Sequence, residues 1–268
     1  MDIKESSPLK DIVKLGDFGV LLGNPNNSAR RAIVFQEFRG VKLVTKLGTS
    51  VEAKNAVTLE TQNLESLPED LQGVPNLVEV NNEENWASYT TTWVDGSSPK
   101  QSDVPAILDF LNSWRIGAEA QSLNSLPVWN DLVSEVTCED EIEFLKVAGE
   151  CVVSESIVHG DFTPWNLKID TKGNINVLDW ECYRRGGAAG WDWAHYFVQS
   201  ALLVDKGDAE EVLKRAYEWG NSVQGREYLK RTGWGRNVNA WIGTYLLYKD
   251  HVLKFDRKDL IKCWKKMK

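Results

Sequence analysis

The amino-terminal part of the chain alternates apolar and polar residues, which is the pattern of half-buried strands. It does so at Asp17–Leu22, Ala32–Gln36 and Val41–Leu47, with turn-forming residues between these stretches. The segment Ala53–Leu67 instead repeats its apolar residues at helical spacing, and Trp86–Val94 is again typical of a strand. The pattern therefore predicts a small sheet with one main helix.

The rest of the chain is mostly helical in its pattern. Apolar residues recur every three or four positions, which is the spacing of a helix face that packs on a core. The predicted helices are one that opens at Ser102, then Val128–Val136, Glu139–Val153, Trp191–Val204, Ala209–Gly220, Asn237–Asp250 and Asp256–Lys266. We therefore predict an α+β chain with two domains, residues 1–95 and residues 96–268.

Two short apolar strands in the second half enclose a polar loop. Ser156–Val158 leads into this loop, which carries Asp161 and, five residues later, Asn166. A turn and a second apolar strand, Ile175–Leu178, then deliver Asp179 at its end. The pattern places two carboxylates and a carboxamide at the mouth of one hairpin. Such oxygen ligands, with a spare carboxylate, suit Mg²⁺ and the activation of a hydroxyl group.

This stretch resembles the catalytic loop of the protein-kinase superfamily, and most closely that of its aminoglycoside phosphotransferase and choline kinase branch. The matching residues are His159-Gly160-Asp161, Asn166 and the triplet Asp179-Trp180-Glu181. The resemblance covers roughly residues 17–199. It implies a bilobal, protein kinase-like α+β fold, in which the first predicted domain is a small β-rich nucleotide lobe and the second a larger helical lobe with the catalytic and substrate sites.

The resemblance also implies a role for each polar residue. Asp161 would accept the proton of the attacking hydroxyl, while Asn166 and Asp179 would hold Mg²⁺ on the phosphates of ATP. His159 would brace the loop by hydrogen bonding. The implied activity is that of a small-molecule kinase, a phosphotransferase with an alcohol group as acceptor. The alternative of another class is a pseudokinase-like binding module, although such a module has no chemical need for all three oxygen ligands.

The third predicted strand offers two lysines on one face, Lys42 and Lys46. By the resemblance, Lys46 is the preferred ligand of the ATP phosphates, because it follows the apolar pair late in the strand. Glu60, in the helical segment, is the expected partner of this lysine, with Glu65 as the alternative. Arg31, at the start of the second strand, is expected to be solvated.

Two further segments are assigned to ATP by their position in the resemblance. Residues 23–28 are dense in turn formers where the phosphate-covering loop belongs, but they are not G-x-G-x-x-G. The backbone N–H groups of residues 26–29 could still meet phosphate. The last predicted strand would form the hinge to adenine, so Thr91 and Trp93 are predicted to bind the cofactor.

Two features predict activity without phosphorylation. Gly160 stands where many regulated protein kinases have an arginine that receives a phosphorylated loop. Only about a dozen residues separate Asp179 from Asp192, too few for a long switch loop. Asp192 is expected either to lie at a helix N-terminus or to hydrogen-bond the catalytic loop. Both features favour a small-molecule kinase over a switched protein kinase.

Composition excludes several other classes of function. The formal net charge of −8 disfavours nucleic acid as a partner. The four Cys include no C-x-x-C pair and only three His are present, which argues against a disulfide framework and a transition-metal site. We find no basic start followed by an apolar core and no apolar run of membrane-spanning length, so we expect a cytoplasmic protein.

The acceptor is less defined than the chemistry. From Lys249 to the end, eight Lys or Arg stand against three Asp, which gives this tail a charge of +5. Such a tail should repel polycations, which favours a sugar, glycan or amino alcohol over an aminoglycoside antibiotic. The twelve Trp permit stacking on a sugar or a cage for a quaternary ammonium. The tail could also touch a membrane surface, although packing through its apolar stripe is the favoured interpretation.

Overall fold

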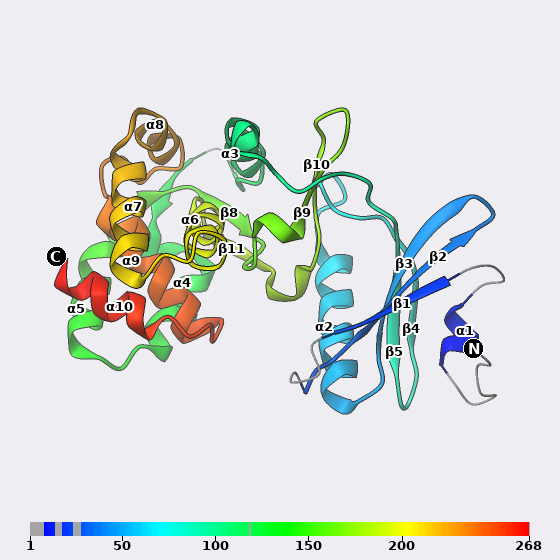
Figure 1. Ribbon diagram of the computed structural model, residues 1–268. Coiled ribbons are helices and arrows are strands. Elements are labelled where there is room, and N and C mark those ends of the chain that lie inside the picture. Colours follow the sequence, from blue (N-terminus) through cyan, green and yellow to red (C-terminus); the bar gives the residue numbers. More distant parts are fainter. Residues whose placement is uncertain (1–7, 14–17, 24–27, 118, 268) are drawn as a thin grey trace. The chain divides into compact units, whose positions relative to one another are not determined.

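The computed structural model describes residues 8–13, 18–23, 28–117 and 119–267, and the chain divides into two compact units. The first unit contains residues 1–97 and 168–181, and the second contains residues 98–167 and 182–268. Figure 1 shows the course of the chain through both. The segment that delivers Asp179 therefore belongs to the same unit as the amino-terminal sheet.

The first unit is built on an antiparallel five-stranded sheet with the order β1-β2-β3-β5-β4. Its elements are α1 (Leu9–Ile12), β1 (Phe18–Leu22), β2 (Ala32–Phe38), β3 (Val41–Gly48), α2 (Val51–Ser66), β4 (Leu77–Asn82) and β5 (Ala87–Thr92), followed by the two-stranded sheet of β9 (Leu167–Ile169) and β10 (Ile175–Val177). The register pairs Lys46 with Ile33 in β2 and with Tyr89 in β5. These three side chains therefore share one face of the sheet.

Helix α2 covers the face of the sheet that carries Lys46, as their direct contact through Glu60 shows. Gly48 permits a close approach of the helix, because a Cβ at this position would lie 2.3 Å from the carbonyl oxygen of Ala53. The opposite face of the sheet packs Leu47 against α1 in a small apolar core. The lysine is thereby held on the helix-covered face.

The second unit is mainly helical. Its helices are α3 (Val104–Ser113), α4 (Pro127–Glu135), α5 (Glu139–Ala148), α6 (Trp191–Gln199), α7 (Ala209–Asn221), α8 (Val223–Arg231), α9 (Val238–Leu247) and α10 (Lys258–Lys266). Two short sheets pair β6 (Gln121–Ser122) with β7 (Val152–Val153) and β8 (Glu155–Val158) with β11 (Arg184–Ala188). Fully buried Trp side chains form much of the core, at Trp114, Trp191, Trp193, Trp234, Trp241 and Trp264. These six of the twelve Trp are thus core residues and are not available for an exposed aromatic cage.

The observed elements differ from the predicted ones in several places. The helix predicted over Glu139–Val153 ends at Ala148, and the chain then forms β7. The helices that begin at Trp191 and Val238 both continue into π-helical turns. The predicted elements do not include β4, in which the apolar Val78 and Val80 are exposed, or α8, which contains few apolar residues. Asp17, the first residue of the first predicted strand, lies outside the described residues. No helix in the described ranges is long and apolar enough to cross a membrane.

Candidate active site

Lys46 is the centre of a charged cluster in the first unit. Its Nζ lies 2.7 and 2.8 Å from the two carboxylate oxygens of Glu60, and 2.8 Å from Oδ1 of Asp179. Burial alone would lower the pKa of Lys46, but the two carboxylates raise this pKa above its usual value, so the ammonium stays charged. Lys42 and Glu65, the alternatives open from the sequence, are both exposed. The structure therefore brings together Lys46 and Glu60.

Glu60 organises the turn that presents Asp179. The Glu60 side chain is 1% exposed, and burial raises its pKa, a shift that Lys46 opposes. Its Oε1 also accepts a hydrogen bond from the N–H of Trp180 at 3.2 Å, the peptide directly after Asp179. Asp179 itself has a φ of 70°, a left-handed conformation that costs strain in a residue with a Cβ. Such strain is typical of functional sites, where the surrounding structure compensates for it.

A second cation, Arg31, belongs to the same cluster. The expectation that Arg31 is solvated is wrong, because its side chain is only 17% exposed and its guanidinium lies 2.6 Å from a carboxylate oxygen of Glu181. Together with Lys46 and Asp179, it lines a pocket of about 130 Å³. Two cations beside a carboxylate suit a phosphate group that carries a divalent metal. Residues 24–27 of the expected phosphate-covering loop lie outside the described residues.

The residues predicted to contact adenine lie at the end of β5. Thr91 pairs with Val44 in β3 and also with β4, so strands flank it on both sides. The N–H of Trp93 donates a hydrogen bond to the carbonyl oxygen of Lys42 at 2.9 Å. The Trp93 ring meets Phe35 edge to face at 5.6 Å, and both rings line a hollow of about 330 Å³. The N–H of Trp93 is therefore already used within the sheet, and a ligand at this strand end would contact the apolar hollow.

In the second unit, Asp161 and Asn166 are in direct contact. Nδ2 of Asn166 donates hydrogen bonds to the carbonyl oxygen of Asp161 at 2.9 Å and to its Oδ2 at 3.0 Å. Because the amide hydrogens are used in this way, the carboxamide oxygen of Asn166 is the atom that can bind a cation. The structure thus brings together the predicted base and one of the two predicted metal ligands.

Asp192 holds the backbone of the loop before Asp161. Its two carboxylate oxygens accept hydrogen bonds from the N–H groups of His159 at 2.8 Å and Gly160 at 3.0 Å. Burial raises the pKa of Asp192 to about 6. The N–H of Asp161 in turn donates to Nδ1 of His159 at 3.2 Å, so this histidine braces the loop. The structure shows both roles left open for Asp192, since it lies in the first turn of α6 and also accepts hydrogen bonds from the catalytic loop.

Gly160 is required by the path of the backbone. Its φ is +80°, and a Cβ at this position would lie 2.4 Å from the carbonyl oxygen of Cys182. No larger residue fits here without movement of the backbone. The lack of an arginine at this position therefore has a steric cause, which weakens its value as evidence about regulation.

The sequence pattern does not predict three buried polar residues around Asp161. Nε2 of His195 lies 2.9 Å from Oδ1 of Asp161, and Nδ1 of His195 lies 3.0 Å from the hydroxyl of Tyr245. Lys249 is 1% exposed, and its Nζ donates to a carbonyl oxygen of the catalytic loop. A local signal was present, since His195 follows Asp192 by three residues and Lys249 follows Tyr245 by four. These spacings place each pair on one helix face.

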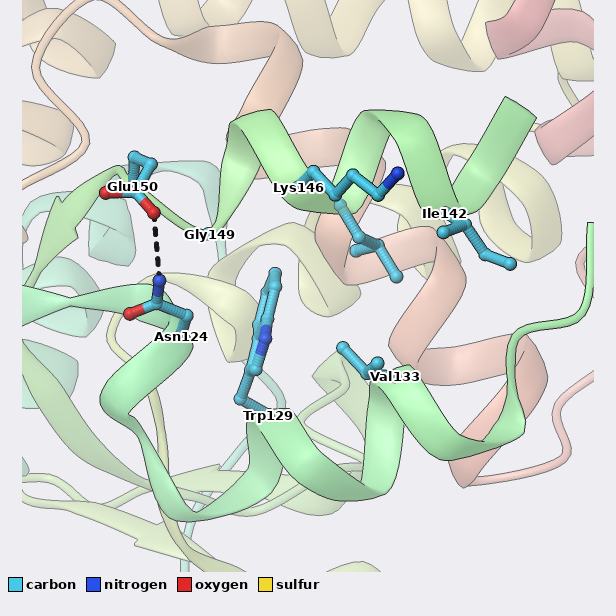
Figure 2. A pocket seen from close by; sticks show the side chains of 8 residues that line it. Asn124, Trp129, Val133, Ile142, Lys146, Gly149 and Glu150 are labelled. Carbon is cyan, nitrogen blue, oxygen red and sulfur yellow. Dashed lines mark hydrogen bonds between the residues drawn. The ribbon is translucent and has the colours of Figure 1, made fainter. Parts of the chain in front are cut away.

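A separate pocket of about 410 Å³ lies between α4 and α5 (Figure 2). Trp129 of α4 and Ile142 and Lys146 of α5 contribute to its wall, and Asn124 donates a hydrogen bond to Glu150 at its rim at 3.1 Å. None of the predicted site residues lines this pocket. It therefore gives no support to the predicted chemistry.

Comparison with known proteins finds similarity in structure only. No family model matches the sequence, and no curated protein matches it. A thermostable mutant of aminoglycoside phosphotransferase APH(4)-Ia, in ternary complex with AMP-PNP and hygromycin B, is 14% identical with a TM-score of 0.57, over 97% of this chain and 96% of that one. The chain has a kinase-like fold.

Two other kinases have the same fold. A putative fructosamine-3-kinase from Haemophilus somnus is 16% identical with a TM-score of 0.53, over 94% of this chain and 91% of that one. Choline kinase LicA from Streptococcus pneumoniae is 12% identical with a TM-score of 0.52, over 96% of this chain and 94% of that one. The predicted α+β kinase-like fold class is thereby confirmed. At these identities the likeness concerns the fold, and the chemistry must be argued from the residues.

Proposed function

We propose that the chain is an ATP- and Mg²⁺-dependent phosphotransferase that moves the γ-phosphate to a hydroxyl group of a small molecule. The observation that carries this proposal is the charged cluster in which Lys46 meets both Glu60 and Asp179 within 2.8 Å. A kinase needs a lysine fixed by a glutamate to hold the phosphates, and a nearby aspartate for the metal. The kinase-like fold supports the same activity.

The oxygen ligands suit Mg²⁺ that arrives with the nucleotide. Within the described part of the chain, no three His, Cys, Asp or Glu side chains gather into a metal site of their own. Mg²⁺ is usually held by one or two protein carboxylates together with substrate phosphates. The carboxylate of Asp179 and the carboxamide oxygen of Asn166 are the proposed protein ligands. Bound there, the metal would neutralise the charge that develops on the phosphate oxygens.

Asp161 is the proposed general base. Its side chain is 20% exposed, so an acceptor can reach it. As the acceptor oxygen attacks the γ-phosphorus, its proton passes to the Asp161 carboxylate. The bond between the γ-phosphorus and the bridging oxygen breaks, and ADP leaves with the electron pair. The products are ADP and a phosphomonoester, and the proton on Asp161 passes to solvent. Lys46, fixed by Glu60, positions the phosphates throughout.

The nucleotide base is proposed to use the apolar hollow beside β5. Phe35 and Trp93 line this hollow. Phe35 pairs with Val44 in β3, two residues before Lys46, so Phe35 and Lys46 lie on the same face of the sheet. Trp93 therefore contributes its ring to this proposal, and Thr91 contributes as a buried residue of the same strand. Substitution of Trp93 by alanine should weaken the binding of ATP more than the binding of inorganic phosphate alone.

The acceptor is proposed to be a sugar, a glycan or an amino alcohol, with an aminoglycoside as the second candidate. The charge of the tail is a weaker argument against polycationic acceptors once the structure is known, because several of its cations are buried or paired. Lys249 is buried, and Lys254 and Lys265 form ion pairs with Glu135 and Glu141 at 2.6 and 2.7 Å. The apolar stripe of α10 is buried as well, which supports packing and not membrane contact.

An acceptor panel tests the activity. Protein shown by intact mass to carry no phosphate is incubated with Mg·ATP and with simple sugars, choline-like amines or aminoglycosides, and phosphorus NMR follows the products. We expect a new phosphomonoester with at least one hydroxyl acceptor, and none when Mg²⁺ is chelated. Binding of Mg·ATP without transfer to any acceptor would support the alternative of a pseudokinase-like binding module.

A further inference from the structure

Both carboxylate oxygens of Asp161 have a neighbour that can donate a hydrogen bond. Nδ2 of Asn166 donates to Oδ2 at 3.0 Å, and Nε2 of His195 lies 2.9 Å from Oδ1. His195 is 1% exposed and lies on α6, 34 residues after Asp161 in the sequence. A carboxylate held at both oxygens by buried or half-buried groups has one orientation.

The ring of His195 is neutral and carries one proton. Burial lowers the pKa of His195 well below its usual value, and the positive charges of Lys249 and Arg257 lower this pKa further. An ionised carboxylate can only accept hydrogen bonds. The single proton of the ring therefore lies on Nε2, the nitrogen that faces Asp161.

Tyr245 fixes the other side of the same ring. Its hydroxyl lies 3.0 Å from Nδ1 of His195, and its side chain is fully buried. Burial raises the pKa of Tyr245, so the hydroxyl keeps its proton. The charge of Arg257 attracts the lone pairs of this oxygen and leaves the O–H to point at Nδ1. Tyr245 thus donates to His195, and His195 donates to Asp161.

We propose that His195 is a positioning residue of the phosphotransfer reaction, which orients Asp161 through its Nε2–H and takes its tautomer from Tyr245. The inference rests on the proposed function, in which Asp161 is the general base. His195 is not a proton relay, because Nε2 already carries a proton and Nδ1 accepts from a weakly acidic phenol. A carboxylate has room for about four hydrogen bonds, so Asp161 can still accept one from the substrate hydroxyl.

Nitrogen-15 NMR of the histidine rings tests the geometry without any need for activity. The chain has only three His, so substitution of each in turn assigns their signals. We expect His195 at neutral pH to be the Nε2–H tautomer, and Asp161→Ala to remove this preference. A charged His195, or an Nδ1–H tautomer in the unsubstituted protein, would overturn the inference.

Kinetics of matched variants test the positioning role. His195→Leu removes the donor. Because one charge-assisted hydrogen bond is lost, we expect kcat to fall about 10- to 100-fold, while KM for ATP stays within about twofold. His195→Gln keeps an amide donor and should recover part of this loss. In an Asp161→Ala background, His195→Leu should have little further effect, because the group that it orients is gone.

His251 provides the matched control. Its Nε2 lies 3.0 Å from a carboxylate oxygen of Glu141, a similar pair of residue types outside the catalytic loop. We expect His251→Gln to leave kcat and KM unchanged. The proposal would be overturned if His195→Gln lost as much kcat as His195→Leu and if His195→Leu caused the same loss in the Asp161→Ala background. That result would show a role in stability alone.

Two further outcomes keep the tests separate. If His195→Leu does not fold, Tyr245→Phe replaces it, and we expect a mixture of both His195 tautomers in NMR and a fall in kcat of about threefold, within the range of one neutral hydrogen bond. An unaltered tautomer in Tyr245→Phe would contradict the role of Tyr245. Failure of the unsubstituted protein to transfer phosphate contradicts the proposed function, while NMR still decides the His195 geometry.

Discussion

The two units hold their functional side chains by different means. In the first unit, Lys46 and Arg31 are held by ion pairs with three carboxylates. In the second, Asp161 is held by hydrogen bonds with Asn166 and a neutral His195. Ion pairs can exchange partners when a phosphate and a metal arrive, whereas hydrogen bonds to a buried ring favour one orientation. The first arrangement suits binding of a charged ligand, and the second suits the positioning of one base.

Burial follows the same plan in both units. Asp179 and Lys46 are 31% and 15% exposed and Asp161 is 20% exposed, whereas the residues that hold them, Glu60 and His195, are each 1% exposed. Because the first cluster is proposed to hold the phosphates and the metal, substitutions in it should change the affinity for Mg·ATP. Substitutions around Asp161 should change kcat and leave this affinity nearly unaltered.

The largest expected effect concerns Asp161. Asp161→Asn keeps the shape of the side chain but cannot accept a proton, so kcat should fall at least about 100-fold while affinity for ATP stays within about twofold. Steady-state kinetics with the preferred acceptor measure both values. Asp109→Asn is a control on the surface of the same unit, where the side chain is 68% exposed. An unchanged kcat in Asp161→Asn would remove this residue from its role as base.

The second prediction tests how deeply the second unit buries its charges. Burial lowers the pKa of Lys249 to about 8 from the usual 10.5. The unfolded chain therefore binds more protons between these two values, and stability should rise as pH rises through this window. The shift corresponds to on the order of 3 kcal/mol, about two orders of magnitude in the unfolding equilibrium.

Lys249→Met should remove this part of the pH dependence. Urea unfolding of both proteins, at the two ends of the window, measures the difference between their slopes. All other titrating groups are shared, so they cancel in the comparison. The same slope in both proteins would mean that Lys249 is solvated and would contradict its buried position.

The third prediction separates the two lysines of β3. Lys46→Ala should lower kcat/KM for ATP about 10- to 100-fold, because a charge-assisted contact to phosphate is lost. Lys42→Ala should have a smaller effect, since the exposed Lys42 borders the hollow beside Trp93 but does not belong to the Lys46 cluster. A titration of ATP with each variant measures this. Similar losses in both would reopen the choice between these residues.

The smallest expected effect concerns Arg31. Arg31→Ala should raise KM for Mg·ATP about three- to tenfold with little change in kcat, since the lost cation is half-buried and already paired. Arg39→Ala removes a cation elsewhere in the same sheet, at the turn between β2 and β3, and should have no such effect. A fall in kcat at constant KM would instead connect Arg31 with the chemical step.

Much of the candidate site could be predicted from local sequence. The spacing of Asp161 and Asn166, and a second strand that ends two residues before Asp179, indicate the proposed chemistry within one short stretch. Alternation along β3 placed Lys42 and Lys46 on one face, but it could not choose between them. That choice depends on where α2 places Glu60, which is a tertiary contact that strand periodicity does not contain.

The remaining site residues depend on contacts distant in the sequence. His195 and Tyr245 lie on α6 and α9, and no local pattern shows that these helices bring the two rings together. The sequence pattern places Lys249 in a basic tail, whereas in the structure its side chain is buried. The sequence pattern predicts a solvated Arg31, because its partner, Glu181, is distant in the sequence. Charge counted along a chain does not reveal which charges are paired.

The most direct test of this division between binding and chemistry compares Asp179→Ala with Asp161→Asn. Isothermal titration measures the affinity of each for Mg·ATP, and a single-turnover assay measures transfer to the preferred acceptor. We predict that Asp179→Ala shows no measurable Mg²⁺-dependent binding of ATP. We predict that Asp161→Asn binds Mg·ATP like the unsubstituted protein and transfers phosphate at least about 100-fold more slowly. Unaltered affinity in Asp179→Ala, or loss of nucleotide binding in Asp161→Asn, would contradict the division.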